Sequence, residues 1–373
     1  MIYLDNAATT KMYEGGVDVY RKYACQSFYN PSAGYNEANE VASNLNSVRE
    51  LIKDKLGVKG DVVFTGGATE SNNLAIMGSK RNGKWEYIFS EGEHPSVYNV
   101  AKELLNSGHI VHFVKLQKNG QVDYEQFASL LNDKTRLISI MHVSNETGAV
   151  NDLKIISRLR KELAPKALLH VDGVQAFCKI DFSLEGLGVD FYTISAHKFH
   201  GPKGVGALYV KNLNSLKPIV WGGGQESGYR SGTENIPGIM AMAYAIENID
   251  TLKNFEHVSC LNKAMRDVLS KDKNVHVQTY DVSSPYILTA WFDGVNAETL
   301  VRALHDDGVL IGKGSACSTK KSGNRILESI GFDAVTIKSH VRISFSELNT
   351  LIEVENAGKI ILSKYNEIRE KVL

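Results

Sequence analysis

The clearest periodic pattern in the chain begins at residue 38, where apolar residues recur every three or four positions. Ala38, Val41, Leu45 and further apolar residues up to Leu56 fall on one side of a helix, and Gly57 follows them. This spacing predicts an amphipathic helix that ends at the glycine and covers a sheet with its apolar side.

Downstream, short runs of β-branched and aromatic residues alternate with segments of helical length. These runs lie at 62–65, 87–90, 110–114, 137–141, 168–171 and 191–194. Alternation of strands and helices is typical of a largely parallel, doubly wound sheet. We therefore predict a large α/β domain over this part of the chain, and we interpret the glycine-rich segment 201–206 as a turn.

The pattern changes in the last third of the chain. A long helical region is expected over 235–269, where it would connect two domains. The strands expected beyond it lie at 275–277, 286–292, 309–311 and 340–345. Because helices separate these strands, this part predicts a small α+β domain.

Composition narrows the class of protein. The 42 basic and 42 acidic side chains cancel, so no overall field favours nucleic acid or an anionic membrane, and we expect a small-molecule substrate and protein partners. No run approaches the roughly 18 apolar residues that span a bilayer. The first residues also lack the features of a signal peptide. We therefore expect a soluble, cytoplasmic protein.

The four cysteines indicate neither a disulfide framework nor a zinc site, because they are few and far apart. We expect reduced thiols and no metal. Cys317 lies among small and polar residues, which favours an accessible nucleophile, although its reactivity requires a lowered pKa. Cys25, Cys178 and Cys260 are interpreted as packing residues.

A lysine and a carboxylate follow two successive predicted strands. Lys198 ends the run Ser195-Ala-His-Lys198, and Asp172 ends the run His170-Val-Asp172, with Gln175 three residues later. Pyridoxal phosphate needs a lysine for its aldehyde and an acid for its ring nitrogen, while Gln175 could hold its phenolic oxygen. Taken alone, Asp172 is better explained as a helix N-cap, but the two motifs together favour the cofactor site.

A glycine pair after the strand at 62–65 provides a candidate phosphate site. Backbone amides that follow Gly66 and Gly67 could face an anion at a helix start, although glycine pairs also form plain turns. Further candidate donors to a phosphate are Ser195, His197 and Thr233.

Three more residues near predicted strand ends carry open alternatives. His94 could stack on a pyridine ring and move protons, or be merely solvated. Asn145 could contact the ring oxygen or a substrate carboxylate, or be a turn residue. Arg342, on an otherwise apolar strand, could clamp a carboxylate or lie at a strand edge in water.

The chain resembles the cysteine desulfurases of the NifS/IscS type, in the class V aminotransferase family. The matching motifs, which cover nearly the whole chain, are Tyr3-Leu-Asp-Asn-Ala-Ala-Thr-Thr10, Asn30-Pro-Ser32, Gly66-Gly-Ala-Thr-Glu-Ser71, Glu93-His94, His142-Val-Ser-Asn-Glu-Thr-Gly148, His170-Val-Asp172 with Gln175, Ser195-Ala-His-Lys198, Arg230-Ser-Gly-Thr-Glu-Asn235, Gly314-Ser-Ala-Cys-Ser318 and Val341-Arg342. The resemblance implies the pyridoxal-phosphate-dependent transferase fold type I, with a mainly parallel seven-stranded sheet. It also implies a large cofactor-binding domain of residues 13–258 and a small domain of residues 1–12 and 259–373.

The resemblance also implies a reaction and a role for each candidate residue. L-Cysteine would become L-alanine, and its sulfur would pass as a persulfide to Cys317 and then to an acceptor protein. Lys198 would form the Schiff base, and His94 would stack on the ring and shuttle protons. The cofactor would be held by Asp172, Gln175, Thr69, Ala68, Ser195, His197 and Asn145. The substrate would be held by Arg342, Asn145 and Asn30. Thr233 would come from the other subunit of a homodimer.

Two departures from the family pattern leave questions open. Tyr35 stands where a histidine is common, and Lys313 replaces a small residue before the Cys317 motif. Charges near Cys317 could favour its thiolate or could simply keep the loop soluble. Other possible functions are a selenocysteine lyase, an aminotransferase of the same fold, or a sulfur-relay protein without catalysis.

Overall fold

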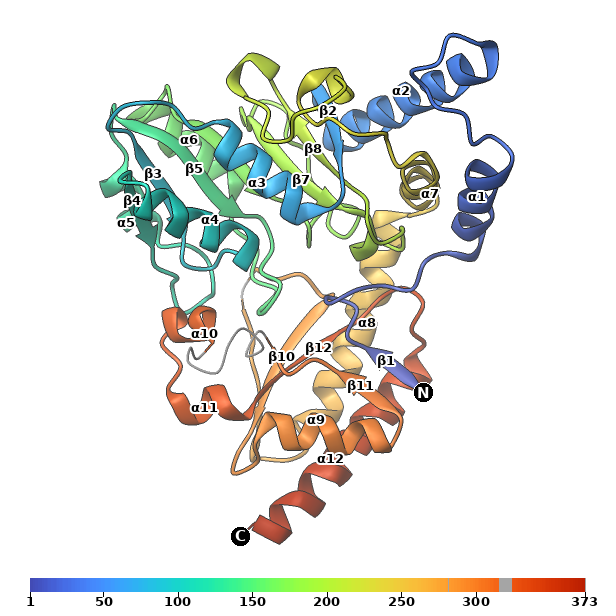
Figure 1. Cartoon of the computed structure of the whole chain (residues 1–373). Coiled ribbons are helices and arrows are strands. Elements are labelled where there is room, and N and C mark those ends of the chain that lie inside the picture. The colour runs from blue at the N-terminus through green and yellow to red at the C-terminus, as the bar shows by residue number, and fades with distance from the viewer. Residues whose placement is uncertain (281, 315–323, 373) are drawn as a thin grey trace.

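The computed structural model describes residues 1–280, 282–314 and 324–372 and shows two stacked units (Figure 1). The upper unit holds a seven-stranded sheet, and the lower unit holds two smaller sheets. Both chain termini lie in the lower unit. The fold is therefore mixed α/β with one large sheet, as the sequence predicts.

The seven-stranded sheet has the strand order β2-β8-β7-β6-β5-β3-β4. Its strands are β2 (Asp61–Thr65), β3 (Glu86–Ser90), β4 (Ile110–Val114), β5 (Thr135–Met141), β6 (Leu168–Asp172), β7 (Phe191–Ser195) and β8 (Gly206–Val210). Only β8 runs against its neighbours. The predicted, mainly parallel sheet is confirmed. Strand β8 was not among the predicted strands, and it begins at Gly206, the last residue of the segment interpreted as a turn.

Helices cover both sides of this sheet because its strands are apolar on both sides. In β3, Ile88 joins one hydrophobic cluster, whereas Tyr87 and Phe89 join the other. Such alternation is expected, since successive strand residues point to opposite sides. The helices of this unit are α1 (Glu14–Cys25), α2 (Asn36–Leu56), α3 (Ala68–Gly78), α4 (Pro95–Asn106), α5 (Tyr124–Leu130), α6 (Leu153–Leu163) and α7 (Ile236–Glu247).

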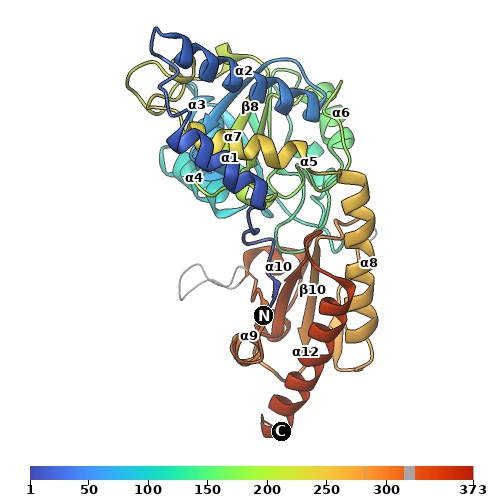
Figure 2. The same cartoon turned by 90° about the vertical axis from the view of Figure 1, so that its right-hand side faces the viewer.

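The helix predicted from residue 38 is confirmed as α2, and it ends at Gly57 with a positive φ of 67°. The helical region expected over 235–269 consists of two helices and not of one continuous helix. The chain forms α7 and then α8 (Thr251–Leu269), because Asn248 ends the first helix and Asp250 caps the second by accepting from the Lys253 amide. Helix α8 leads from the upper unit into the lower one (Figure 2).

The lower unit has its own hydrophobic core, which includes Leu4, Leu261, Leu288 and Ile343. Its sheets are β12-β10-β9, which is antiparallel, and β1-β11, which is parallel. Their strands are β1 (Ile2–Leu4), β9 (Val275–Val277), β10 (Ile287–Phe292), β11 (Val309–Ile311) and β12 (His340–Ser344), accompanied by α9 (Ala297–Asp306), α10 (Arg325–Ile330), α11 (Ala334–Ser339) and α12 (Leu351–Val372). A separate core supports the predicted domain division, whose boundaries stay a prediction.

Helices in the described part of the chain are too short or too polar to cross a membrane. The longest, α12, carries many charged residues along its length.

Candidate active site

A cavity of about 1120 Å³ lies where the parallel strands of the large sheet end. Open α/β sheets collect ligands at the carboxyl ends of their strands, because loops of different units meet there. Asp172 at the end of β6 and Ser195 at the end of β7 line the cavity, and Arg342 of β12 closes it from the lower unit. The cavity therefore lies between the two units.

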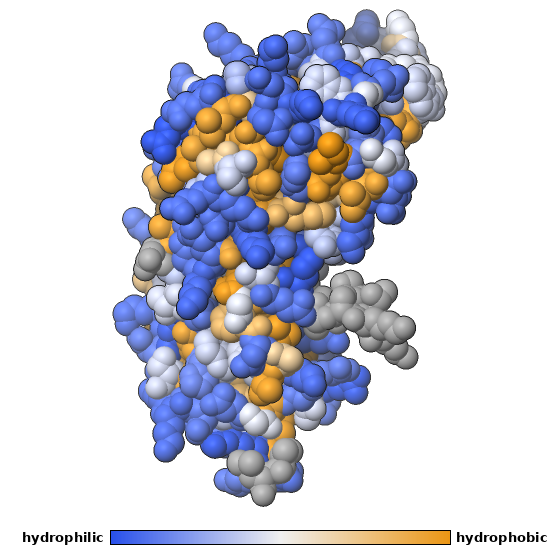
Figure 3. Space-filling model, turned by 90° about the vertical axis from the view of Figure 1, so that its left-hand side faces the viewer, coloured by the Kyte–Doolittle hydropathy of each residue, from blue (hydrophilic) through white to orange (hydrophobic). Residues whose placement is uncertain are grey.

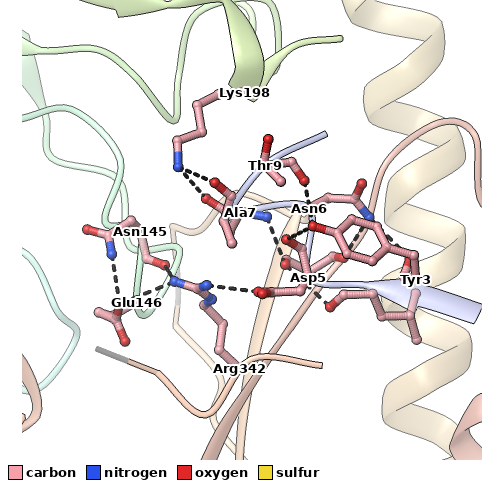
Figure 4. Close-up of polar contacts among 12 residues, drawn as sticks. Tyr3, Asp5, Asn6, Ala7, Thr9, Asn145, Glu146, Lys198 and Arg342 are labelled. Carbon is pink, nitrogen blue, oxygen red and sulfur yellow. Dashed lines mark hydrogen bonds and ion pairs between the residues drawn. The ribbon is translucent and has the colours of Figure 1, made fainter. Parts of the chain in front are cut away.

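Lys198 reaches into this cavity from the short 3-10 helix η1 (Ala196–Lys198), directly after β7. Its Nζ donates to the carbonyl oxygens of Ala7 and Ala8, at 2.8 Å each (Figure 4). Burial lowers the pKa of Lys198 to about 8, and the nearby charge of Arg342 acts in the same direction. A neutral amine is the nucleophilic form, so this site favours attack on an aldehyde.

Asp172 is almost fully buried, and both of its carboxylate oxygens accept hydrogen bonds. Oδ1 accepts from the Val174 amide at 3.1 Å, and Oδ2 accepts from Asn72 Nδ2 at 2.9 Å. Because these donors hold the carboxylate rigidly at the cavity wall, Asp172 is placed to pair with a cationic ring nitrogen.

Gln175 lies on the turn after β6, and its amide is fixed from both ends. Its Nε2 donates to the Ala7 carbonyl at 3.0 Å, and its Oε1 accepts from Lys179 Nζ at 2.8 Å. Lys179 is buried, and burial lowers its pKa to about 7, with the charge of Lys198 contributing. The Lys179 contact determines which end of the Gln175 amide is the donor.

The N-terminus of α3 forms another wall of the cavity. Gly66, Gly67, Ala68 and Thr69 line it, and the first amides of a helix have no partner within the helix, which suits an anion. Nearby, burial lowers the pKa of His197 to about 4, with the charges of Lys198 and Lys203 contributing. The predicted phosphate donors Thr69, Ser195 and His197 therefore surround one part of the cavity.

Arg342 differs from the open carboxylate clamp considered from the sequence. Its Nη2 donates to Asp5 Oδ1 at 2.9 Å, and its Nη1 donates to the Asn145 carbonyl at 2.9 Å and to Glu146 Oε1 at 3.2 Å (Figure 4). It is buried, not at a strand edge in water. A substrate carboxylate at Arg342 must therefore share the guanidinium with two protein carboxylates.

His94 lines the cavity as the N-cap residue of α4, where its side chain accepts from the Ser96 amide. Burial lowers its pKa, the charge of Asp172 opposes this, and Lys198 and Arg325 lower it further. A neutral imidazole beside a carboxylate and an amine can hold or move a proton near neutral pH.

Other candidate residues lie outside this cavity. Asn30 and Thr233 are exposed and do not line it, and Cys317 lies outside the described residues. Tyr35 packs edge-on against Tyr29, and Lys313 lies 3.8 Å from Glu298 in an ion pair.

Two of the three remaining cysteines differ from the sequence interpretation. Cys178 is a buried packing residue, as expected, and burial raises its pKa to about 12. Cys25 and Cys260 are exposed, so the expectation that they pack in the core is wrong. Both lie on helices, on the side that faces away from the core.

Several residues of the cavity were not found from local sequence patterns. Ala7, Ala8 and Thr9 line it, as do Glu146 and Lys203. Ala7 and Ala8 contribute backbone carbonyl oxygens, which leave no side-chain signal in a sequence. The only signal for them is the resemblance of the N-terminal motif to the family.

Comparisons with known proteins agree with this geometry. The family model described as Aminotransferase class-V matches residues 2–357. A NifS/IcsS protein homolog of Lactobacillus delbrueckii subsp. bulgaricus is 37% identical, with 95% of this chain and 94% of the relative covered. The cysteine desulfurase IscS of Pseudoalteromonas translucida is 34% identical, with 99% and 94% covered.

Two solved structures share the fold. A NifS-like protein has a TM-score of 0.91 and 30% identity, with 98% of this chain and 99% of the other covered. SspA in complex with cysteine has a TM-score of 0.83 and 30% identity, with 94% and 100% covered. With a family match over nearly its whole length and relatives of this similarity, the chain belongs to the class-V aminotransferase family.

Proposed function

We propose that the protein is a cysteine desulfurase that uses pyridoxal phosphate. The observation that carries this proposal is that Lys198 and Asp172 line one cavity, with the N-terminus of α3 at a further wall. These groups match an aldehyde, a ring nitrogen and a phosphate, respectively. The relatives named as cysteine desulfurases and the related structure with cysteine bound support L-cysteine as the substrate.

The residues of the cavity fit this cofactor by the chemistry of their donors. Asp172 would hold the ring nitrogen, Gln175 the ring oxygen, and Thr69, Ser195 and His197 the phosphate. Asn145 Oδ1 is buried without a partner among the described residues, so it can accept a hydrogen bond from a bound group. When bound, pyridoxal phosphate supplies a ring that takes up the electron pair left on the substrate carbon after proton loss.

The chain's own residues supply binding and proton transfer. Arg342, oriented by Asp5 and Glu146, holds the substrate carboxylate. Lys198 Nζ, neutral above pH about 8, accepts the α-proton of the substrate. His94 holds or moves a proton at its ring on another wall of the cavity.

Cys317 carries the sulfur step in this proposal. Its sulfur would bond to the substrate sulfur as the carbon–sulfur bond of cysteine breaks, which leaves alanine and a persulfide on the protein. The persulfide would then pass to an acceptor protein. This role rests on the motif Gly314-Ser-Ala-Cys-Ser318.

A Cys317→Ser variant tests the proposal, with Cys260→Ser as the matched control. We expect the full chain with pyridoxal phosphate to form alanine and a persulfide on Cys317, read by peptide mass spectrometry. Cys317→Ser should lose at least about 99% of turnover but keep the visible absorption of the bound cofactor, whereas the exposed Cys260 should be dispensable. Normal sulfide release by Cys317→Ser would contradict the proposal and favour a lyase that needs no protein thiol.

We also infer a homodimer in which Thr233 of each chain contributes to the phosphate site of the other. Thr233 is exposed and lies outside the cavity of its own chain. Figure 3 shows apolar side chains gathered on one face of the unit with the large sheet, which suits burial against a second copy. Sedimentation should give the mass of two chains, and Thr233→Ala should weaken cofactor binding; a monomer that binds the cofactor fully would contradict this inference.

A further inference from the structure

Four buried or partly buried side chains form an unbroken chain of hydrogen bonds beneath the cavity. Asn72 Nδ2 donates to Asp172 Oδ2 at 2.9 Å and to Ser96 Oγ, also at 2.9 Å. Ser96 Oγ lies 2.8 Å from Nδ1 of His94. These contacts join the end of β6 to the starts of α3 and α4, so they connect two candidate cofactor-binding residues through Asn72 and Ser96.

The direction of each hydrogen bond follows from what its atoms can donate. A carboxylate oxygen accepts, so the Asn72 amide must present its NH₂ group to Asp172. The same NH₂ group donates to Ser96 Oγ, which leaves the Ser96 hydroxyl proton free for His94 Nδ1. The Ser96 backbone amide also donates to Nδ1, at 3.2 Å. Nδ1 therefore accepts from two donors and cannot carry a proton itself.

Burial makes this arrangement costly to change. Asn72 is fully buried and Ser96 nearly so, and Asn72 Oδ1 has no partner among the described residues. Turning the amide over would place that oxygen against the Asp172 carboxylate and remove the donor to Ser96, so the observed orientation is strongly preferred.

We propose that Asn72 and Ser96 are positioning residues that hold the His94 ring in the tautomer with its proton on Nε2. The ring nitrogen on the side away from Ser96 is then a hydrogen-bond donor to whatever occupies the cavity. His94 cannot accept a proton at Nε2 in this state, and to accept one at Nδ1 it would have to lose the hydrogen bond from the Ser96 amide and reverse the one with the Ser96 hydroxyl. This hydrogen-bond relay of Asp172, Asn72, Ser96 and His94 thus makes Nε2 of His94 a hydrogen-bond donor, and not a proton acceptor, at the start of the reaction.

The charges that act on this ring come from three elements. Asp172 on β6 raises the pKa of His94, whereas Lys198 on η1 and Arg325 on α10 lower it, in addition to burial. Hydrogen bonds donated to Nδ1 stabilise the neutral ring and so lower the pKa as well. Loss of the Ser96 hydroxyl should therefore raise it.

Nitrogen NMR of the full chain tests the tautomer directly. With ¹⁵N-labelled histidine, two-bond proton–nitrogen spectra show which ring nitrogen carries the proton, and a His94→Gln spectrum identifies the signals among the 11 histidines. We expect His94 to carry its proton on Nε2. A wild-type ring with the proton on Nδ1 would overturn the proposal.

Variants separate positioning from a merely structural role. Ser96→Ala, in which only the backbone amide still donates to Nδ1, should weaken the preference for the Nε2–H tautomer and raise the pKa of His94 by about 0.5 to 1, the equivalent of one neutral hydrogen bond. Ser96→Thr, which keeps a hydroxyl, should restore both. Asn72→Asp should resemble Ser96→Ala, because a carboxylate there would accept the hydroxyl proton. Ser107→Ala, an exposed serine at the end of the same helix, is the matched control and should change neither.

The kinetic readout depends on the proposed function, whereas the NMR readout does not. If the protein turns over cysteine, the acidic limb of kcat/KM against pH should move upward in Ser96→Ala by the same amount as the His94 pKa. Unchanged tautomer and pKa in Ser96→Ala would reject the relay even if cysteine is the substrate. A wild-type chain that lacks desulfurase activity but shows the expected tautomer would reject only the function.

Discussion

The Lys198 amine shows how single residues set the reactivity of the site. An ordinary lysine with a pKa near 10.4 is neutral in well under about 1% of molecules at pH 8. At a pKa of about 8, close to half of the Lys198 amines are neutral there. Burial is the main cause and Arg342 the next, while Asp172, Asp5 and Glu146 oppose them.

Arg342→Gln should therefore raise the pKa of Lys198. Schiff-base formation requires the neutral amine, so its rate in the cofactor-free chain should rise with pH through a midpoint near 8 in the wild type. In Arg342→Gln the midpoint should move upward, by about one pH unit at most for a removed charge. Visible absorbance after addition of pyridoxal phosphate measures this rate between pH 6 and 10.

The matched control is Lys203→Gln, which removes a cation that lines the same cavity but is not among the main influences on Lys198. Its midpoint should stay near that of the wild type. A wild-type midpoint near 10, or equal midpoints in wild type and Arg342→Gln, would contradict the assigned cause.

For single residues, the sequence predicts which side chains line the cavity better than it predicts which residues those side chains contact. Lys198, Asp172 and Gln175 were found because each follows a strand, and all three line the cavity. Asn72 and Lys179 were missed because their roles depend on contacts within the folded core, where nothing in the local pattern marks them. Arg342 was found, but its two carboxylate partners lie 337 and 196 residues away.

Among the elements, β8 supports the phosphate wall of the cavity by close backbone contact. A Cβ atom on Gly206, the first residue of β8, would lie 2.7 Å from the Ile194 carbonyl oxygen and 2.9 Å from Gly67 Cα. Real Cβ atoms do not approach backbone so closely, so the turn before α3 would have to move. The absence of a side chain at Gly206 thus places Gly66 and Gly67.

Gly206→Ala should weaken both stability and phosphate binding. We expect a loss of about 1–3 kcal/mol in the free energy of unfolding, typical of overpacking, and a weaker affinity for pyridoxal phosphate than for the wild type. Urea unfolding and a cofactor titration measure the two effects. Gly34→Ala, where a Cβ meets nothing within 4 Å, should leave cofactor affinity unchanged; an equal loss in both variants would argue against the contact.

Elements with a strong repeat of apolar residues were predictable from the sequence, whereas an element that depends on pairing with neighbouring strands was not. Helix α2 repeats apolar residues over about five turns, and both the helix and its end at Gly57 were predicted. Strand β8 has five residues after a glycine-rich segment, and only its pairing with β2 and β7 makes it a strand. The break between α7 and α8 left a local signal in Asn248 and Asp250, which a continuous helical pattern on both sides obscured.

Across the whole molecule, one partly buried carboxylate joins the lower unit to the upper one. Glu347, three residues after β12, accepts from the Tyr13 hydroxyl and lies 3.3 Å from His200 Nε2. Tyr13 and His200 stack, with ring centroids 4.6 Å apart. Burial raises the pKa of Glu347, but the contacts with His200 and Tyr13 outweigh burial and lower it to about 2.

This lowered pKa predicts a specific loss of stability in acid. In the unfolded chain a glutamate has a pKa near 4.3, so the folded state gains stability from ionised Glu347 at pH values above that. The gain, about 3 kcal/mol, should disappear as pH falls from about 5 to 2, where the folded carboxylate binds a proton. Glu347→Gln should be less stable than wild type at pH 7 by a similar amount, and the difference should shrink steadily below pH 5.

Urea unfolding at pH 7, 5, 4 and 3 measures this difference in stability, with the exposed Glu256→Gln of α8 as control. If the difference between wild type and Glu347→Gln stays constant over that range while Glu256→Gln behaves as wild type, Glu347 contributes through its shape and not through its charge, and its charge does not hold the two units together.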